Sequence, residues 1–129
     1  MRGPLGFPGR LAVVAFVQQE DRQPSPLIPI LVVPIRVDLS NVRELTSPIA
    51  EALGAGAIHV VLDFSVTEAV DSTALGALVQ IHKKVQAAQG QLVLFGVGDS
   101  VRRVLALTRL DSVFKLASNR SEALSLLSR

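Results

Sequence analysis

The sequence predicts an α/β fold in which about four helices pack on a mixed, mostly parallel sheet of about five strands. Three observations lead to this prediction. Short apolar runs rich in Val, Leu and Ile recur along the 129 residues, as buried strands require. Stretches with helical periodicity separate the later runs. Because strands that alternate with helices are joined by crossovers, most of their pairings are expected to be parallel.

The N-terminal part is predicted to contain a lead-in and two strands. Residues 1–10 are rich in Gly and Pro, and we expect a flexible lead-in there. Strands are expected at 11–17 and, after a polar loop, at 27–37. Since Pro29 and Pro34 each remove a hydrogen-bond donor, the second strand should lie at a sheet edge or be interrupted.

A turn and the first helix should follow. Asp38 opens a turn with capping residues, and a helical pattern begins after it. A proline in a helix interior costs about 3 kcal/mol, and Pro48 would occupy such a position. We therefore expect a short turn at 41–46 and a fresh helix that starts at Ser47 and is ended by Gly54 and Gly56.

The central part joins a buried strand at 57–63 to a helix at 73–88 through a short loop. Three side chains at the start of this helix, those of Asp71, Ser72 and Thr73, can cap it. A serine thus lies at the positive end of a helix dipole, where an added phosphate would be best tolerated. Without further information, the simpler interpretation of this serine is an N-cap.

The C-terminal part should alternate strands and helices. We expect a strand at 91–97, a helix at 101–108 capped by Asp99 and Ser100, a short strand at 112–117, and a last helix capped by Ser118 and Asn119. The GVGDS segment lacks the GK[ST] ending of a phosphate-binding loop, so we interpret it as a strand-to-helix turn.

The composition argues against several classes of partner. Five Phe and no Tyr or Trp leave little on which single-stranded bases could stack. A net charge of +2, without a basic run longer than two residues, does not suit a phosphate-tracking surface. Neither a spanning apolar stretch nor a signal-peptide cleavage pattern is found. We expect no nucleic-acid partner, no direct membrane insertion and a cytoplasmic location, which the absence of cysteine also fits.

No residue pattern indicates catalysis or a metal. Asp38 and Asp71 could suggest paired carboxylates, but turn and cap roles are the simpler interpretation, and no activating base accompanies them. His59 and His82 lack acidic or cysteine partners at ligand spacing. We expect no catalytic residue, no metal and no cofactor, so the protein should not be an enzyme.

Three ordered segments carry a family resemblance. They are RVDLSNVREL, VVLDFSVTEAVDSTALGAL and GQLVLFGVGDSVRRVLALTRLDSVFKL. From about residue 28 to 127, the chain resembles a STAS domain of the type found in bacterial anti-sigma-factor antagonists. The resemblance implies the STAS fold, with the domain covering 11–129 after the flexible lead-in.

The resemblance also implies a function. In that family the serine directly after the signature aspartate is phosphorylated by a partner kinase, and the matching residue is Ser72. An anti-sigma factor antagonist of this kind is a protein-interaction switch in the regulation of transcription. When unphosphorylated, it binds a serine-kinase anti-sigma factor and releases sigma; a phosphatase of the phosphoserine resets it. The implied partner-binding residues are Asp38, Asp71, Ser72, Thr73, Ala74 and Leu75.

The sequence departs from the family pattern at Ile35, Pro48, Ala74 and Arg109, and a second function stays open. Ala74 stands where the family has a glycine, next to the implied phosphosite. Arg109 replaces the usual glycine of the last helix-to-strand turn, so a left-handed turn is disfavoured there. The alternative function is a STAS accessory subunit of a membrane (lipid or anion) transport complex, in which the same helix surface docks an ATPase and needs no phosphate.

Overall fold

The computed structural model of the 129-residue chain describes residues 11–14 and 28–127. The expected lead-in at 1–10 and the loop between the first two strands lie outside the described residues. The proposed domain boundaries therefore stay a prediction.

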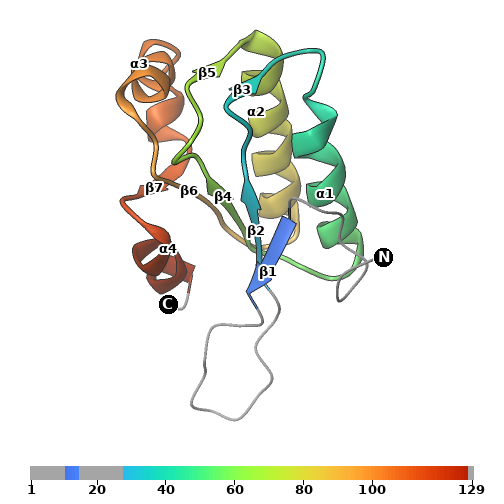
Figure 1. Cartoon of the computed structure of the whole chain (residues 1–129). Coiled ribbons are helices and arrows are strands. Elements are labelled where there is room, and N and C mark those ends of the chain that lie inside the picture. The colour runs from blue at the N-terminus through green and yellow to red at the C-terminus, as the bar shows by residue number, and fades with distance from the viewer. Residues whose placement is uncertain (1–10, 15–27, 128–129) are drawn as a thin grey trace.

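The described elements alternate as the sequence predicts (Figure 1). In chain order they are β1 (Leu11–Val14), β2 (Ile28–Val32), β3 (Arg36–Val37), α1 (Arg43–Gly54), β4 (Val60–Asp63), β5 (Ala69–Val70), α2 (Ser72–Ala87), β6 (Leu92–Phe95), α3 (Asp99–Leu107), a 3₁₀ turn (Leu110–Ser112), β7 (Lys115–Ala117) and α4 (Arg120–Leu127).

A five-stranded sheet in the order β1-β2-β4-β6-β7 forms the centre of the fold. Strand β1 runs antiparallel to β2, and the other neighbours in this sheet pair in parallel. Helices α1 and α2 lie on one side of the sheet and α4 lies on the other (Figure 1). This arrangement confirms the predicted α/β fold with a mixed, mostly parallel sheet.

Both faces of the central strands are buried, and their side chains divide between two cores. Because successive side chains of a strand point to opposite faces, Val60 and Leu62 of β4 join the larger core while Val61 joins the smaller one. The larger core includes Leu45 of α1 and Leu78 of α2. The smaller core is closed by Ala123 and Leu127 of α4, with Ile30 and Val93 from the strands.

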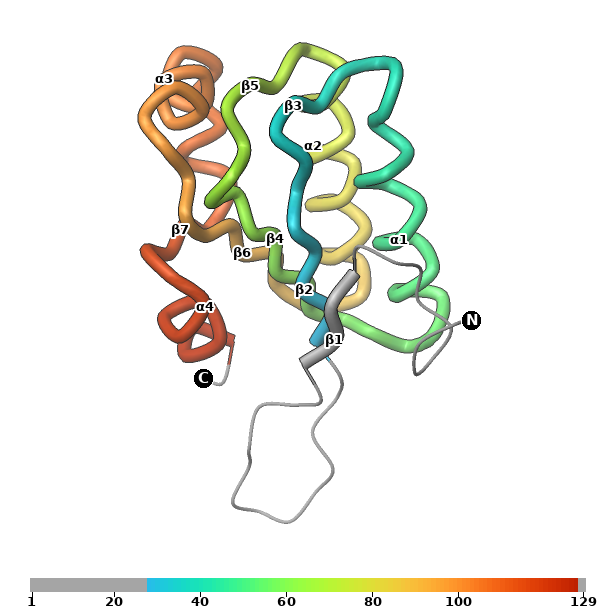
Figure 2. The backbone as a smooth tube through the Cα atoms, in the orientation of Figure 1, coloured from blue at the N-terminus to red at the C-terminus, as the bar shows by residue number. Residues whose placement is uncertain are grey.

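The strand at 27–37 was expected either to lie at a sheet edge or to be interrupted, and the structure confirms the interruption. Its first part, β2, is not an edge strand because β1 pairs with it on the outer side. The chain leaves the sheet through Val33, Pro34 and Ile35, and β3 then pairs in parallel with β5. Figure 2 shows this small second sheet beside the start of α2.

The expectation of a fresh helix at Ser47 is wrong, because α1 is continuous from Arg43 to Gly54 with Pro48 inside it. Pro48 removes the hydrogen bond that its amide would have donated to the carbonyl of Glu44. Its ring is buried on the same helix face as Leu45, Ile49 and Ala52. Packing of this apolar face offsets the lost hydrogen bond, so the helix is retained.

The expectation that Arg109 would avoid a left-handed turn is also wrong, since its φ is 63° and its ψ is 17°. An L-residue in this region is strained relative to glycine. Local hydrogen bonds hold it there: its amide donates to the Ala106 carbonyl at 3.1 Å, and the Ser112 hydroxyl donates to its carbonyl at 3.0 Å. The 3₁₀ turn that follows shortens the strand expected at 112–117 to β7.

Candidate functional site

The small β3–β5 sheet places two aspartates side by side. Val37 of β3 pairs with Val70 of β5, and Asp38 and Asp71 follow directly. The amide of Asp71 donates to the carbonyl of Val37 at 3.2 Å. Both acidic residues therefore lie at the carboxyl end of a parallel pair, next to the first turn of α2. In the sequence they are separated by more than thirty positions.

Asp71 is the N-cap of α2. Its backbone is extended, with φ −103° and ψ −173°, and its carboxylate accepts a hydrogen bond from the Ala74 amide at 2.9 Å. An N-cap side chain reaches the amide two or three residues ahead, and Asp71 occupies the position from which this is possible. The simpler interpretation of Ser72 as the cap is therefore wrong.

Ser72 is the first residue of α2 and is exposed. No residue in the described part of the chain forms a hydrogen bond with its hydroxyl group. The amides of a helix's first turn carry partial positive charge, and Ser72 lies among them. The hydroxyl is thus sterically open to a modifying enzyme at a position that favours an added anion.

The three residues after Ser72 are all at least half-buried. Thr73 and Leu75 are half-buried, and Leu75 packs against the larger core. Ala74 is only 1% exposed, so its methyl group belongs to the core and not to the surface. Of this part of the implied partner surface, Asp71 and Ser72 are the most accessible to another protein.

Asp38 is held by a compact turn. The hydroxyl and the amide of Ser40 both donate to its carboxylate, and the Asp38 amide donates to the side-chain oxygen of Asn41 at 2.9 Å. The hydrogen bonds from Ser40, with a smaller contribution from the charge of Arg36, hold the pKa of Asp38 below its usual value. Asp38 therefore presents a fixed negative charge beside the start of α2.

Leu39 is a surface residue that the sequence analysis did not assign to the site. Its side chain is 76% exposed and directly follows Asp38. A large apolar side chain within an otherwise polar turn is the signal that could have identified it. Single exposed apolar residues are common, but this one adjoins the two acidic loops, so it adds apolar area to the same surface.

The first turn of α3 adjoins the loop that leads into β5. The hydroxyl of Ser100 donates to the carbonyl of Glu68 at 2.8 Å. Ser100 was expected to cap α3, but the helix begins at Asp99 and its N-cap is Gly98. This serine instead fixes α3 to the segment that carries Asp71.

Within residues 11–14 and 28–127, no group of three or more His, Cys, Asp or Glu side chains could hold a metal ion. The same part of the chain contains no helix long and apolar enough to cross a membrane. What the site offers is therefore an exposed hydroxyl, two neighbouring acidic side chains and an exposed leucine. These are features of a surface for recognition or modification.

The structure is thus an α/β domain with helices on both faces of its sheet, and the candidate site lies at the start of α2, which Asp71 caps. A family model described as the STAS domain matches residues 21–123. The chain belongs to the STAS domain family.

Named relatives agree with this assignment. A protein of Thermotoga neapolitana, provisionally named an anti-sigma factor antagonist, is 38% identical over 74 residues, which cover 57% of this chain and 66% of the relative. The match thus spans slightly less than two thirds of that protein. A Thermotoga maritima protein with the same provisional name has a crystal structure that superposes with a TM-score of 0.73 at 30% identity, covering 79% of this chain and 88% of the other.

More distant structures share the fold. The phosphorylated form of the Bacillus cell fate determinant SpoIIAA superposes with a TM-score of 0.61 at 19% identity, covering 76% of this chain and 88% of SpoIIAA. An anti-sigma factor antagonist of Mycobacterium paratuberculosis gives 0.71 at 21% identity over the full length of both chains.

Proposed function

We propose that this protein is an anti-sigma factor antagonist that acts as a phosphorylation-controlled interaction switch. Unphosphorylated, it binds a serine-kinase anti-sigma factor through the surface of Asp38, Asp71, Ser72, Thr73 and Leu75, and sigma is released. Membership of the STAS family and the names of the Thermotoga relatives support this role. The proposed action is non-catalytic, takes place in the cytoplasm and needs no cofactor on this chain.

The observation that carries the proposal is the position of Ser72. Its hydroxyl is exposed and without a hydrogen-bond partner among the described residues, while Asp71 performs the capping. A kinase can therefore modify Ser72 without removing the interaction that starts α2. The helix is expected to persist in both states.

Electrostatics explain how a phosphate at Ser72 would act as a switch. Phosphorylation adds about −1.5 to −2 charges at neutral pH. The helix N-terminus favours this charge, while the carboxylates of Asp71 and Asp38 oppose it. The modified surface would be strongly acidic around Leu39, so a partner that recognises the unmodified surface would lose affinity. SpoIIAA has likewise been solved in unphosphorylated and phosphorylated forms.

The proposed partners follow from this switch. The anti-sigma factor would be the kinase, with ATP and Mg²⁺ as its own cofactors, and a separate phosphatase would restore the serine. Leu39 is proposed as an additional contact, because its side chain is exposed and directly follows Asp38 in the same turn.

The proposal is tested by intact-mass spectrometry after incubation with ATP, Mg²⁺ and lysate of the source cells. We expect one added phosphate on the unaltered protein and none on Ser72→Ala. Thr73→Ala is the matched control, because it removes the neighbouring hydroxyl and should still accept one phosphate. Tandem mass spectrometry then assigns the modified residue.

The opposite result has a clear meaning. If neither the unaltered protein nor Thr73→Ala gains a phosphate, the kinase-controlled switch is rejected. The STAS accessory subunit of a transport complex then becomes the function to test, by pull-down of an ATPase subunit from membranes. In that case, Ser72→Ala should bind as well as the unaltered protein.

A further inference from the structure

Arg36 lies on the solvent-facing side of the small β3–β5 sheet. Its side chain is exposed, whereas that of the next residue, Val37, is buried in the larger core. Arg36 pairs with Ala69 of β5, two residues before Asp71. Because alternate residues of an extended chain share a face, the side chains of Arg36, Asp38 and Asp71 are directed to the same side. Standard sheet dimensions put the backbone of Asp71 about 8 Å from that of Arg36, within reach of an arginine side chain.

The guanidinium of Arg36 is available for a new partner. The carbonyl of this residue accepts a hydrogen bond from the Asn41 side chain at 2.7 Å, but no described residue forms an ion pair or a hydrogen bond with its guanidinium. The positive charge contributes to the lowered pKa of Asp38, so the guanidinium lies within electrostatic range of that carboxylate. An exposed arginine that no carboxylate holds loses little free energy when it moves to a stronger anion.

Arg36 is also the sole cation of the two segments that form the small sheet and the loops around it. Residues 35–42 and 64–75 contain three acidic residues, Asp38, Glu68 and Asp71, and no other Lys, Arg or His. A phosphate on Ser72 would add about −1.5 to −2 charges to this surface. The one positive charge nearby would relieve part of the resulting repulsion, and a guanidinium can bind a phosphate through two parallel hydrogen bonds.

We propose that Arg36 is the counter-charge of the phosphorylated state and pairs with a phosphate on Ser72. This inference rests on the proposed phosphorylation of that serine. In the unmodified protein, the guanidinium lies near Asp38 and gives an otherwise acidic surface one positive group. Phosphorylation would then change the surface in two ways, because it adds an anion at the start of α2 and withdraws a cation from the Asp38 turn.

The test uses protein in which phosphoserine is incorporated at position 72 during translation, so it needs no kinase. The pKa of the second ionisation of the phosphate is measured from ³¹P NMR shifts between about pH 4.5 and pH 8. An adjacent guanidinium stabilises the dianion, so Arg36→Gln should raise this pKa by about 0.5 or more. Arg36→Lys keeps the charge and should retain at least about half of the effect.

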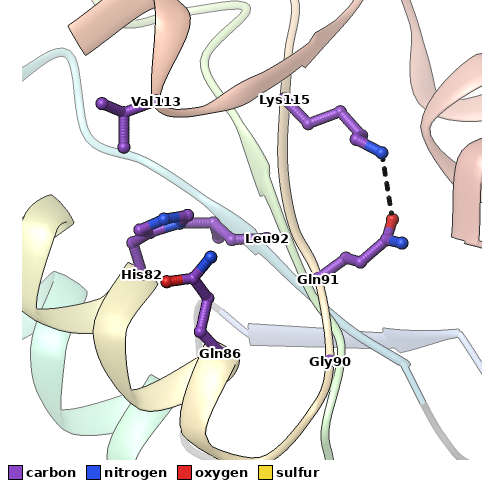
Figure 3. Close-up of a pocket in the computed structure, with 7 residues that line it drawn as sticks. All are labelled: His82, Gln86, Gly90, Gln91, Leu92, Val113 and Lys115. Carbon is purple, nitrogen blue, oxygen red and sulfur yellow. Dashed lines mark hydrogen bonds between the residues drawn. The ribbon is translucent and has the colours of Figure 1, made fainter.

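Lys115→Gln is the matched control for the loss of one positive charge. Lys115 is exposed on β7 and lines, with His82, a cavity of about 230 Å³ beside the second half of α2 (Figure 3). His82 lies ten residues beyond Ser72, so the cavity is about 15 Å away along the helix. Arg43→Gln tests the next arginine of the chain, at the start of α1. Both controls should leave the pKa of the phosphate nearly unchanged.

The proposal is overturned if Arg36→Gln has the same phosphate pKa as the unaltered phosphoprotein, or if either control raises this pKa equally. It is also overturned if Arg36→Lys behaves like Arg36→Gln. These outcomes are independent of the intact-mass experiment, which asks whether a kinase modifies Ser72. The proposed switch would stand if Arg36 had no effect on the phosphate, and the pairing would remain measurable if no kinase were found.

Discussion

His59 joins the loop before β4 to the start of β6. Its Nδ1 accepts a hydrogen bond from the Gln91 amide at 3.0 Å, which requires that this nitrogen carry no proton. Burial lowers the pKa of His59 from its ordinary value of 6.5. Protonation in the folded state therefore disrupts a contact between two segments that are distant in the sequence.

We expect the stability of the protein to depend on pH through His59. The pKa is lower in the folded state, so the unfolded chain binds more protons between the two values. The contribution of neutral His59 to the free energy of unfolding is fully present above pH 6.5. It is lost as the pH falls from there toward the folded-state pKa. Urea unfolding at several pH values from 7.5 to about 5 should show this decline.

His59→Gln is the control, because its side-chain oxygen can accept the same hydrogen bond without titrating. The variant should lose part of the decline between those pH values. Identical pH profiles for the two proteins would contradict the assignment to His59.

At the scale of elements, a glycine within α2 and a glycine just after it have different structural roles. Gly90 follows α2, but the left-handed residue in that turn is Gln89, with φ 64°. Gly90 is needed for a different reason: a Cβ there would lie 1.7 Å from the carbonyl oxygen of Ile58. Gly76 lies within α2, and a Cβ there would meet nothing within 4 Å.

We expect Gly76→Ala to stabilise the protein by about 0.5 to 1 kcal/mol, because alanine loses less backbone entropy in a helix. Gly90→Ala should destabilise it by at least about 2 kcal/mol, since the backbone of Ile58 must move to relieve the overlap. Urea midpoints of the two variants measure both effects. Equal changes at both positions would show that helix propensity, and not the contact with Ile58, governs Gly90.

At the scale of the whole molecule, the two faces of the sheet are covered unequally. The larger core packs against α1, α2 and α3, whereas the smaller core relies on the eight residues of α4. Within α4 the buried residues are Ala123 and Leu127. A capping arrangement fixes its start, with the Glu122 amide donating to Asn119 and the Ser118 amide donating to the Glu122 carboxylate.

We expect Ala123→Asp to destabilise the whole domain by about 3 kcal/mol or more, because it places an unpaired charge in the smaller core. Ala123 is fully buried, while Ser121 is exposed in the first turn of the same helix. Ser121→Asp should therefore leave the thermal midpoint nearly unchanged. A comparable loss of stability in both variants would mean that charge on α4, and not burial, is the cause.

Much of the architecture could be predicted because apolar periodicity is a local property of the sequence. Strands β4 and β6 and helix α2 were predicted in this way, and the family motif identified Ser72 as a candidate. Strand β5 was missed because two residues give no periodic signal, and its pairing with β3 depends on tertiary contacts.

The predictions that failed, and the features that were not predicted, also depend on tertiary contacts. Burial of the apolar face of α1 retains Pro48 within the helix, and hydrogen bonds with Ala106 and Ser112 hold Arg109 in its turn. The cavity beside His82 could not be predicted, because its walls come from segments that only the folded chain brings together. Sequence position alone also could not tell which of three neighbouring side chains caps α2.

The β3–β5 pairing has a consequence for the kinetics and thermodynamics of association. Main-chain hydrogen bonds from Glu68 and Ala69 to Ile35, and from Asp71 to Val37, connect the Asp38 turn to the start of α2. The two segments are therefore expected to move as one rigid unit. A partner that docks across them immobilises a single body, so less conformational entropy is lost on binding than with two independent loops. Much of the ordering of these two segments that binding requires has already occurred during folding.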